Sequence, residues 1–214
     1  MPFGLSNASA TFQRLMERVL SRLQWDICLI YLDDIIIFSR TLEDHISQLQ
    51  AVFARLKAAN LKLKAKKCHL FRRQVAYLGH LVSEEGVAAD PEKLKAVREW
   101  PRPRAVSDVR SFVGLCSYYR RFIPDFATVA KPLICLTEKY RQFKWGRDQE
   151  EAWLEMKRRL ITAPVLAYPD PDRPFILDTD ASDTGIGAVQ DLDGQERVIT
   201  YSNEPSASKS VGTV

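Results

Sequence analysis

The chain has 214 residues, of which 46% are hydrophobic and 27% charged, with a formal net charge of +4 and a pI near 8.9. This composition is typical of a globular protein with one sizeable domain or two to three small ones, and it is too polar for a membrane protein. No stretch approaches the roughly 20 apolar residues of a membrane span, and the start lacks the pattern of a signal peptide, so we expect an intracellular protein of the cytoplasm or nucleus.

The first predicted element is an amphipathic helix. It begins near Asn7 or Ser9, either of which is a residue type that caps helices. The apolar residues that follow recur at the i, i+3, i+4 and i+7 spacing of one helical face, which predicts a buried side. These residues are Phe12, Leu15, Met16, Val19, Leu20 and Leu23.

Two adjacent aspartates, Asp33 and Asp34, stand between the apolar runs 27–31 and 35–38. Apolar runs of this length on either side of a turn predict a pair of short strands. Ionised carboxylates are costly in such surroundings unless they are paired, hydrated or bound to a cation. The pair therefore either caps an exposed turn or holds a metal ion.

A second helix and a further strand are predicted next. Thr41 and Asp44 have the spacing of a capping box, and Asn60 marks the end of the helix that they begin. A basic segment follows, and residues 75–82 then predict a single strand.

The remainder of the chain changes from helical to strand patterns. Asp90 and Pro91 begin a run of helices that extends to about residue 162. From Pro174 onward three short strands are predicted, the last two joined by a turn at 193–194. The tail from about residue 203 is small, polar and unpatterned, which predicts disorder.

Positive charge is concentrated in two clusters. Cations beside aromatic side chains suit a nucleic-acid strand, with its phosphates and stackable bases, although a solvated basic face also accounts for either cluster alone. The first cluster comprises Lys62, Lys64, Lys66, Lys67, Arg72 and Arg73, and the second comprises Arg102, Arg104, Arg110, Arg120 and Arg121 beside Tyr118, Tyr119 and Phe122.

Six blocks of sequence, in order, resemble the reverse transcriptase and RNase H region of gypsy-like long-terminal-repeat retrotransposon polyproteins. One block is the YLDD turn that contains the aspartate pair. A Tyr-x-Asp-Asp motif alone is weak evidence, whereas six blocks in the family's order are specific. The other five are MPFGLSNASATFQ, LKLKAKKCHLF, YLGHLV, VRSFVGLCSYYRRFIPDFATVAKPL and APVLAYPDPDRPFILDTDASDTGIGAV.

The resemblance implies an α+β fold in three parts. Residues 1–83 would form part of a reverse transcriptase palm, and residues 84–145 a helical thumb and connection. Residues 146–214 would form the first strands of an RNase H-like domain, followed by the disordered tail.

The resemblance also implies two-metal chemistry. Asp33 and Asp34 would be catalytic ligands of Mg²⁺, or of Mn²⁺, during nucleotidyl transfer. Asp180 would be the first metal-binding aspartate of an RNase H site, whereas Asp178 and Asp183 are interpreted as polar residues of a strand end or turn. The implied partners are an RNA or DNA template-primer and dNTPs, with the oligomeric state left open.

Further binding residues follow from the same resemblance. Phe3 and Gly4 would line the pocket of the incoming nucleotide, and Gln13 would lie near the template strand. Lys67, or its neighbour Lys66, would lie near the leaving pyrophosphate.

A primer grip is implied at the YLGH sequence. Its residues are Tyr77, Leu78, Gly79 and His80, although a buried edge strand would explain them equally well.

Parts of the family's pattern lie outside this sequence. The family has a further palm aspartate on a strand before MPFGL, and its RNase H site continues beyond VITYSN. We therefore expect both active sites to be incomplete. One hypothesis is a fragment of an RNA-directed DNA polymerase with RNase H. The alternative is a catalytically inactive retrotransposon remnant that at most binds nucleic acid, so catalysis by the chain itself is left open.

Overall fold

The computed structural model of the chain describes residues 5–179, 186–192 and 194–202. By their contacts these residues belong to two compact units, Met1–Arg72 and Arg73–Val214. Each unit has its own hydrophobic core. None of the described helices is both long and apolar enough to cross a lipid bilayer.

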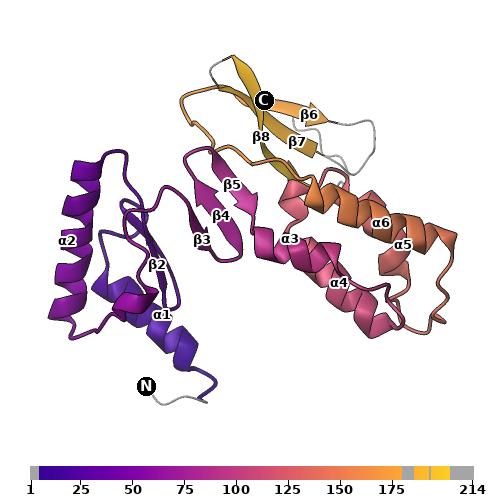
Figure 1. The fold of residues 1–214 in the computed structure, drawn as a ribbon, viewed down its shortest axis with the longest axis horizontal. Helices are drawn as coiled ribbons and strands as arrows, with labels where there is room; N and C mark the ends of the chain where they lie inside the picture. Colours follow the sequence, from indigo (N-terminus) through magenta and orange to yellow (C-terminus); the bar gives the residue numbers. More distant parts are fainter. Residues whose placement is uncertain (1–4, 180–185, 193, 203–214) are drawn as a thin grey trace, which may run out of the picture. The chain divides into compact units, whose positions relative to one another are not determined.

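The first unit contains helices α1 (Ala8–Val19) and α2 (Leu42–Ala58) and a two-stranded antiparallel sheet (Figure 1). The strands are β1 (Cys28–Tyr31) and β2 (Asp34–Ile37), and a short 3₁₀ helix, η1 (Ala65–Lys67), follows α2. The predicted order of helix, hairpin and helix is confirmed.

A side-chain cap marks the start of α2, and a left-handed residue marks its end. The Asp44 N–H donates to Thr41 Oγ1 at 3.1 Å, and the Thr41 hydroxyl donates to Asp44 Oδ2 at 2.8 Å. Asn60 adopts a left-handed conformation with φ of 55°, which asparagine tolerates better than most residues. The predicted helix start and end are therefore confirmed.

Strand alternation separates a core face of the β1–β2 hairpin from an open face. Cys28 pairs with Ile37 and Ile30 with Ile35, so these side chains point toward the core. Tyr31 pairs with Asp34 on the opposite face, and both are exposed. The buried core consists of Met16, Leu20, Cys28, Ile30, Val52 and Leu56.

The second unit begins with the antiparallel sheet of β3 (Val75–Tyr77), β4 (His80–Ser83) and β5 (Gly86–Ala89). The prediction of one strand over 75–82 was wrong, because the chain reverses between β3 and β4. Leu78 and Gly79 have φ angles of 48° and 70°, the left-handed conformations of a two-residue hairpin turn. Glycine at position 79 is compatible with such a turn, but leucine at position 78 does not predict one.

Helices α3 to α6 form the main core of this unit and gather together in Figure 1. They are α3 (Pro91–Arg98), α4 (Val106–Tyr118), α5 (Phe126–Cys135) and α6 (Arg147–Ile161), with a 3₁₀ turn η2 (Arg120–Phe122) between α4 and α5. The predicted helical middle is confirmed. Fully buried side chains in this core include Val97, Phe112, Cys116, Phe122, Leu133 and Leu160.

A second antiparallel sheet, in the order β6–β7–β8, ends the described chain. Its strands are β6 (Ile176–Thr179), β7 (Ile186–Leu192) and β8 (Gln195–Ser202), as the strand patterns predict. Gln190 of β7 is fully buried, and its amide bonds to backbone groups of Asp170 and Arg173 at 2.8 to 2.9 Å. The loop before β6 is thereby fixed to the sheet.

The segment between α6 and β6 connects the two sheets of the second unit. Leu166 exchanges two backbone hydrogen bonds with Val87 of β5, at 2.8 and 2.9 Å, and the Ala167 N–H donates to Val198 of β8 at 2.9 Å. Gly86 makes this approach possible, because a Cβ there would lie 2.1 Å from the Leu166 carbonyl oxygen.

Candidate functional site

The aspartate pair lies at the tip of the β1–β2 hairpin. Asp33 forms the two-residue turn with Leu32, and Asp34 is the first residue of β2. Both side chains are exposed, and within the described residues neither carboxylate forms a hydrogen bond or ion pair. The two carboxylates are therefore available to an external cation.

The backbone of this turn is held in an uncommon conformation. Leu32 has a φ of 54°, which costs a non-glycine residue on the order of 1–3 kcal/mol. Gln13 of α1 accepts a hydrogen bond from the Leu32 N–H, and its amide donates to the Ile30 carbonyl at 3.4 Å and to Glu17 Oε1 at 2.8 Å. Helix α1 therefore fixes the hairpin tip through Gln13. Contact of Gln13 with a template stays a prediction.

The chemistry of the pair fits a hard divalent cation. Mg²⁺ and Mn²⁺ prefer carboxylate oxygens, and Mg²⁺ commonly takes one or two carboxylates while water and phosphate complete its shell. Within the described residues no group of three or more acidic, histidine or cysteine side chains converges. Phe3, Gly4 and Asp180, as well as Asp183, lie outside the described residues.

A continuous basic segment follows α2. Lys67 ends η1, where its N–H donates to the Lys64 carbonyl at 2.8 Å, and Lys66 precedes it. All six cations of the first cluster are exposed, and in the described part of the chain no carboxylate pairs with them. The segment therefore exposes positive charge that no described carboxylate neutralises.

In the second unit the turn of the YLGH sequence is held by two tyrosines. The Tyr118 hydroxyl donates to the Leu78 carbonyl at 2.5 Å, and the buried Tyr119 hydroxyl donates to the Gly79 carbonyl at 2.7 Å. The His80 ring stacks on Tyr118 with centroids 5.3 Å apart and meets Tyr119 edge-on at 5.5 Å. The end of α4 therefore fixes the β3–β4 turn. Sequence reasoning missed this role, for which the adjacent tyrosines were the available signal.

Burial favours the neutral forms of His80 and Tyr119. It lowers the pKa of His80, an effect that nearby Arg121 reinforces and Asp90 partly opposes. Burial, with contributions from Tyr118 and Asp90, raises the pKa of Tyr119 to about 12. Tyr119 is therefore a stable hydrogen-bond donor at neutral pH.

Two family models match separate parts of the chain. Residues 1–82 match the reverse transcriptase (RNA-dependent DNA polymerase) family, and residues 145–210 match the RNase H-like domain found in reverse transcriptase. Among solved structures, the foamy viral protease-reverse transcriptase in complex with double-stranded DNA has a TM-score of 0.82 and 26% identity, covering 95% of this chain and 36% of that one. A complex of the foamy viral protein with an RNA/DNA hybrid has a TM-score of 0.79 and 25% identity, covering 95% and 28%. Residues 1–82 therefore match the reverse transcriptase family and residues 145–210 the RNase H-like domain family, on a fold similar to that of the foamy viral proteins.

Similar sequences among transposon polyproteins identify the family more narrowly. The Pol polyprotein from transposon 297 of Drosophila melanogaster is 43% identical over 195 residues, which cover 91% of this chain and 18% of that polyprotein. The Pol polyprotein from transposon gypsy of the same organism is 41% identical over 207 residues, covering 91% and 20%. The chain therefore belongs to the reverse transcriptase and RNase H region of gypsy-type retrotransposon Pol polyproteins, and it spans about a fifth of their length. The predicted family and α+β fold are confirmed.

Proposed function

We propose that residues 1–214 supply the catalytic turn and part of the nucleic-acid contact surface of an RNA-directed DNA polymerase. The observation that carries this proposal is the exposed Asp33–Asp34 pair, whose carboxylates have no partner within the described residues. Gln13 of α1 bonds to the backbone of this turn, so a residue outside the hairpin helps to fix the position of both carboxylates.

In the proposed reaction a primer 3′-hydroxyl attacks the α-phosphate of a dNTP. Asp33 and Asp34 would hold Mg²⁺ or Mn²⁺, which would supply positive charge to stabilise the attacking hydroxyl oxygen and the oxygen of the leaving pyrophosphate. Gln13 keeps the backbone of the turn fixed, so that both carboxylates are presented in one geometry. Lys67, or Lys66 beside it, supplies positive charge near the leaving pyrophosphate.

The remaining assignments of the proposal rest on the family. Phe3 and Gly4 contact the nucleotide, Tyr77 to His80 support the primer terminus, and Asp180 is a metal ligand of the RNase H-like part. The foamy viral complexes with double-stranded DNA and with an RNA/DNA hybrid support a duplex as the partner. Segment boundaries near residues 83 and 145 belong to the same proposal.

Nucleic-acid binding without catalysis is the second candidate function. The unpaired cations of residues 62–73 favour it, because phosphate contacts need only clustered positive charge. The chain would then be a catalytically inactive remnant that retains affinity for a duplex.

Replacement of the matching segment in a related polyprotein tests the proposal. Residues 1–214 are substituted for the corresponding segment of the Pol polyprotein of transposon gypsy, and RNA-templated DNA synthesis is measured with Mg²⁺ and dNTPs. We expect synthesis above that of a graft carrying Asp33→Asn and Asp34→Asn. Duplex binding by both grafts with equal absence of synthesis would instead support the second candidate.

A further inference from the structure

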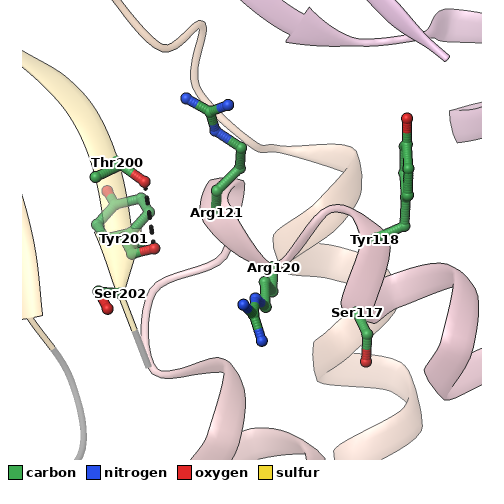
Figure 2. A pocket seen from close by; sticks show the side chains of 7 residues that line it. All are labelled: Ser117, Tyr118, Arg120, Arg121, Thr200, Tyr201 and Ser202. Atoms are coloured by element: carbon green, nitrogen blue, oxygen red, sulfur yellow. Dashed lines mark hydrogen bonds between the residues drawn. The ribbon is translucent and has the colours of Figure 1, made fainter. Parts of the chain in front are cut away.

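An open cavity of about 410 Å³ in the second unit is lined by residues of α4, η2 and β8. Its two charged groups do not converge, because Figure 2 shows the side chains of Arg120 and Arg121 pointing to opposite sides of η2. The other lining side chains carry uncharged hydroxyl groups. The cavity therefore presents no single binding centre, whereas a surface on α2 of the first unit is better defined.

Helix α2 carries two apolar stripes, and only one of them belongs to the core of the first unit. Leu56 lies in that core, and Leu49 is also buried. The second stripe follows the i, i+4, i+7 and i+11 spacing of one helical face, and it passes through Leu49. Its other members are open to solvent, with Leu42 59%, Ile46 43% and Phe53 38% exposed.

This second stripe has the character of an interaction surface. Apolar residues that are exposed singly are ordinary on a protein surface, whereas a row along one helical face is typical of a helix that packs against a partner. Figure 1 shows α2 running along one side of the first unit. The exposed fractions show that no described element covers the second stripe.

The charges beside this stripe indicate what the partner is. Glu43 is the second residue of α2 and Lys57 is the last but one. Both lie on the same edge of the stripe, because their separation in the sequence is close to four helical turns. Both are exposed, and within the described residues neither forms an ion pair. An edge that is acidic at one end and basic at the other complements the same edge of an antiparallel copy.

We propose that α2 pairs with α2 of a second copy of this chain, antiparallel about a two-fold axis through the middle of the helix. Ile46 of each copy then packs against Phe53 of the other, and Glu43 of each lies beside Lys57 of the other. A parallel pair would instead place like charges opposite one another, which is unfavourable. The proposal depends on neither the metal site at Asp33 and Asp34 nor a nucleic acid.

Sedimentation equilibrium of the 214-residue chain tests the pairing. One helix pair buries less surface than a standard interface, so we expect a dimer Kd of about 10–100 µM. At higher concentrations the mass should approach twice the 24.5 kDa of one chain. Ile46→Gln should stay monomeric, whereas Leu154→Gln, at a 53% exposed position of α6, should dimerise like the wild type. A monomeric wild type, or an Ile46→Gln variant that dimerises equally well, would overturn the proposal.

Charge reversal tests the antiparallel orientation. Glu43→Lys and Lys57→Glu each place like charges opposite one another at both ends of their own dimers, so at low salt each should raise the dimer Kd by about tenfold. Mixing the two variants restores both opposite-charge pairs, and so does the double variant Glu43→Lys/Lys57→Glu in one chain. Both samples should associate like the wild type, which would show that charge and not altered folding weakens the single variants. Failure of both samples to recover, with wild-type circular dichroism, would overturn the proposed pairing.

Discussion

Leu32 is the residue on which the geometry of the aspartate turn depends. Its left-handed backbone places Asp33 in the turn and Asp34 at the start of β2, and Gln13 holds the Leu32 N–H. A leucine in this conformation persists only when neighbouring contacts outweigh its cost. The site is thus defined by two acidic side chains and by the helix residue that holds their backbone.

Replacing Gln13 by alanine should loosen the turn. We expect the free energy of unfolding to fall by about 0.5–1.5 kcal/mol, the usual contribution of a lost intramolecular hydrogen bond. In the gypsy graft the rate of nucleotide incorporation should also fall, while duplex affinity is kept. Denaturant unfolding and single-turnover incorporation measure these effects.

Gln50→Ala is the matched control, because Gln50 is an exposed position of α2 away from the turn. It should change neither the free energy of unfolding nor the rate of nucleotide incorporation. If the two variants behave alike, Gln13 is an ordinary surface residue and the proposed role of α1 is wrong.

His80 predicts a pH dependence of the second unit. Its pKa is lowered on folding, chiefly by burial, so the unfolded chain binds a proton first as the pH falls. The stability that neutral His80 contributes is complete above its unfolded pKa of about 6.5 and is lost as the pH falls through the lower folded pKa. We expect the melting temperature of this unit to decrease below about pH 6.5.

Tryptophan fluorescence can follow this unit alone. Trp100, Trp145 and Trp153 belong to it, and a Trp25→Phe background removes the signal of the first unit. His80→Gln should flatten the acid decrease in melting temperature, whereas His69→Gln, at an exposed position of the other unit, should not. An unchanged acid decrease in His80→Gln would exclude this histidine as its source.

At the scale of elements, the contact between β5 and the α6–β6 segment depends on Gly86. Gly86→Ala places a Cβ 2.1 Å from the Leu166 carbonyl oxygen and imposes a φ of 137° on an alanine. The backbone conformation alone should cost about 1–3 kcal/mol, and separation of β5 from the α6–β6 segment would add to this cost. Chemical denaturation followed by tryptophan fluorescence measures the loss.

Gly114→Ala is the appropriate comparison, because its Cβ would meet no atom within 4 Å in helix α4. It should leave stability unchanged or raise it, since alanine favours helix over glycine by about 1 kcal/mol. Equal stability of the two variants would contradict the described contact at Leu166.

Elements governed by neighbouring residues could be predicted from the sequence. Thr41 and Asp44 identified the start of α2, and the apolar runs beside the aspartate pair identified β1 and β2. The β3–β4 turn was missed because Leu78 adopts a left-handed conformation that its residue type disfavours.

Contacts between residues that are distant in the sequence could not be predicted from the sequence pattern. Tyr118 lies 40 residues from Leu78, and Gln13 lies 19 residues from Leu32. Periodicity and capping patterns relate residues that are only a few positions apart in the sequence. The hydrogen bonds that hold the β1–β2 and β3–β4 turns join distant residues, so only the structure could reveal them.

At the scale of the whole chain, the two compact units predict a defined site of first cleavage. All six cations of residues 62–73 are exposed, and the units meet in sequence at Arg72–Arg73. Limited trypsin digestion should therefore cut first in this segment and release a fragment that begins near residue 73, as mass spectrometry would report.

Lys157 provides an internal comparison for that digestion. Its amino group lies 4.6 Å from the centre of the Trp153 ring and donates to the Trp100 carbonyl at 3.0 Å, so cleavage after it should be slow. Equal rates at Lys157 and in residues 62–73 would contradict the division into units. Resistance to trypsin near residues 83 and 145 would count against the proposed segment boundaries at these positions.

The most direct measurement is single-turnover nucleotide incorporation by the gypsy graft with Asp33→Asn. Loss of one carboxylate ligand removes several kcal/mol of transition-state stabilisation, so the rate should fall on the order of 10³-fold while the Kd for the template-primer stays unchanged. Asp26→Asn makes the same chemical change at an exposed position two residues before β1 and should retain the wild-type rate. A rate for Asp33→Asn within about tenfold of that of Asp26→Asn would contradict the assignment of the aspartate pair as the catalytic metal ligands.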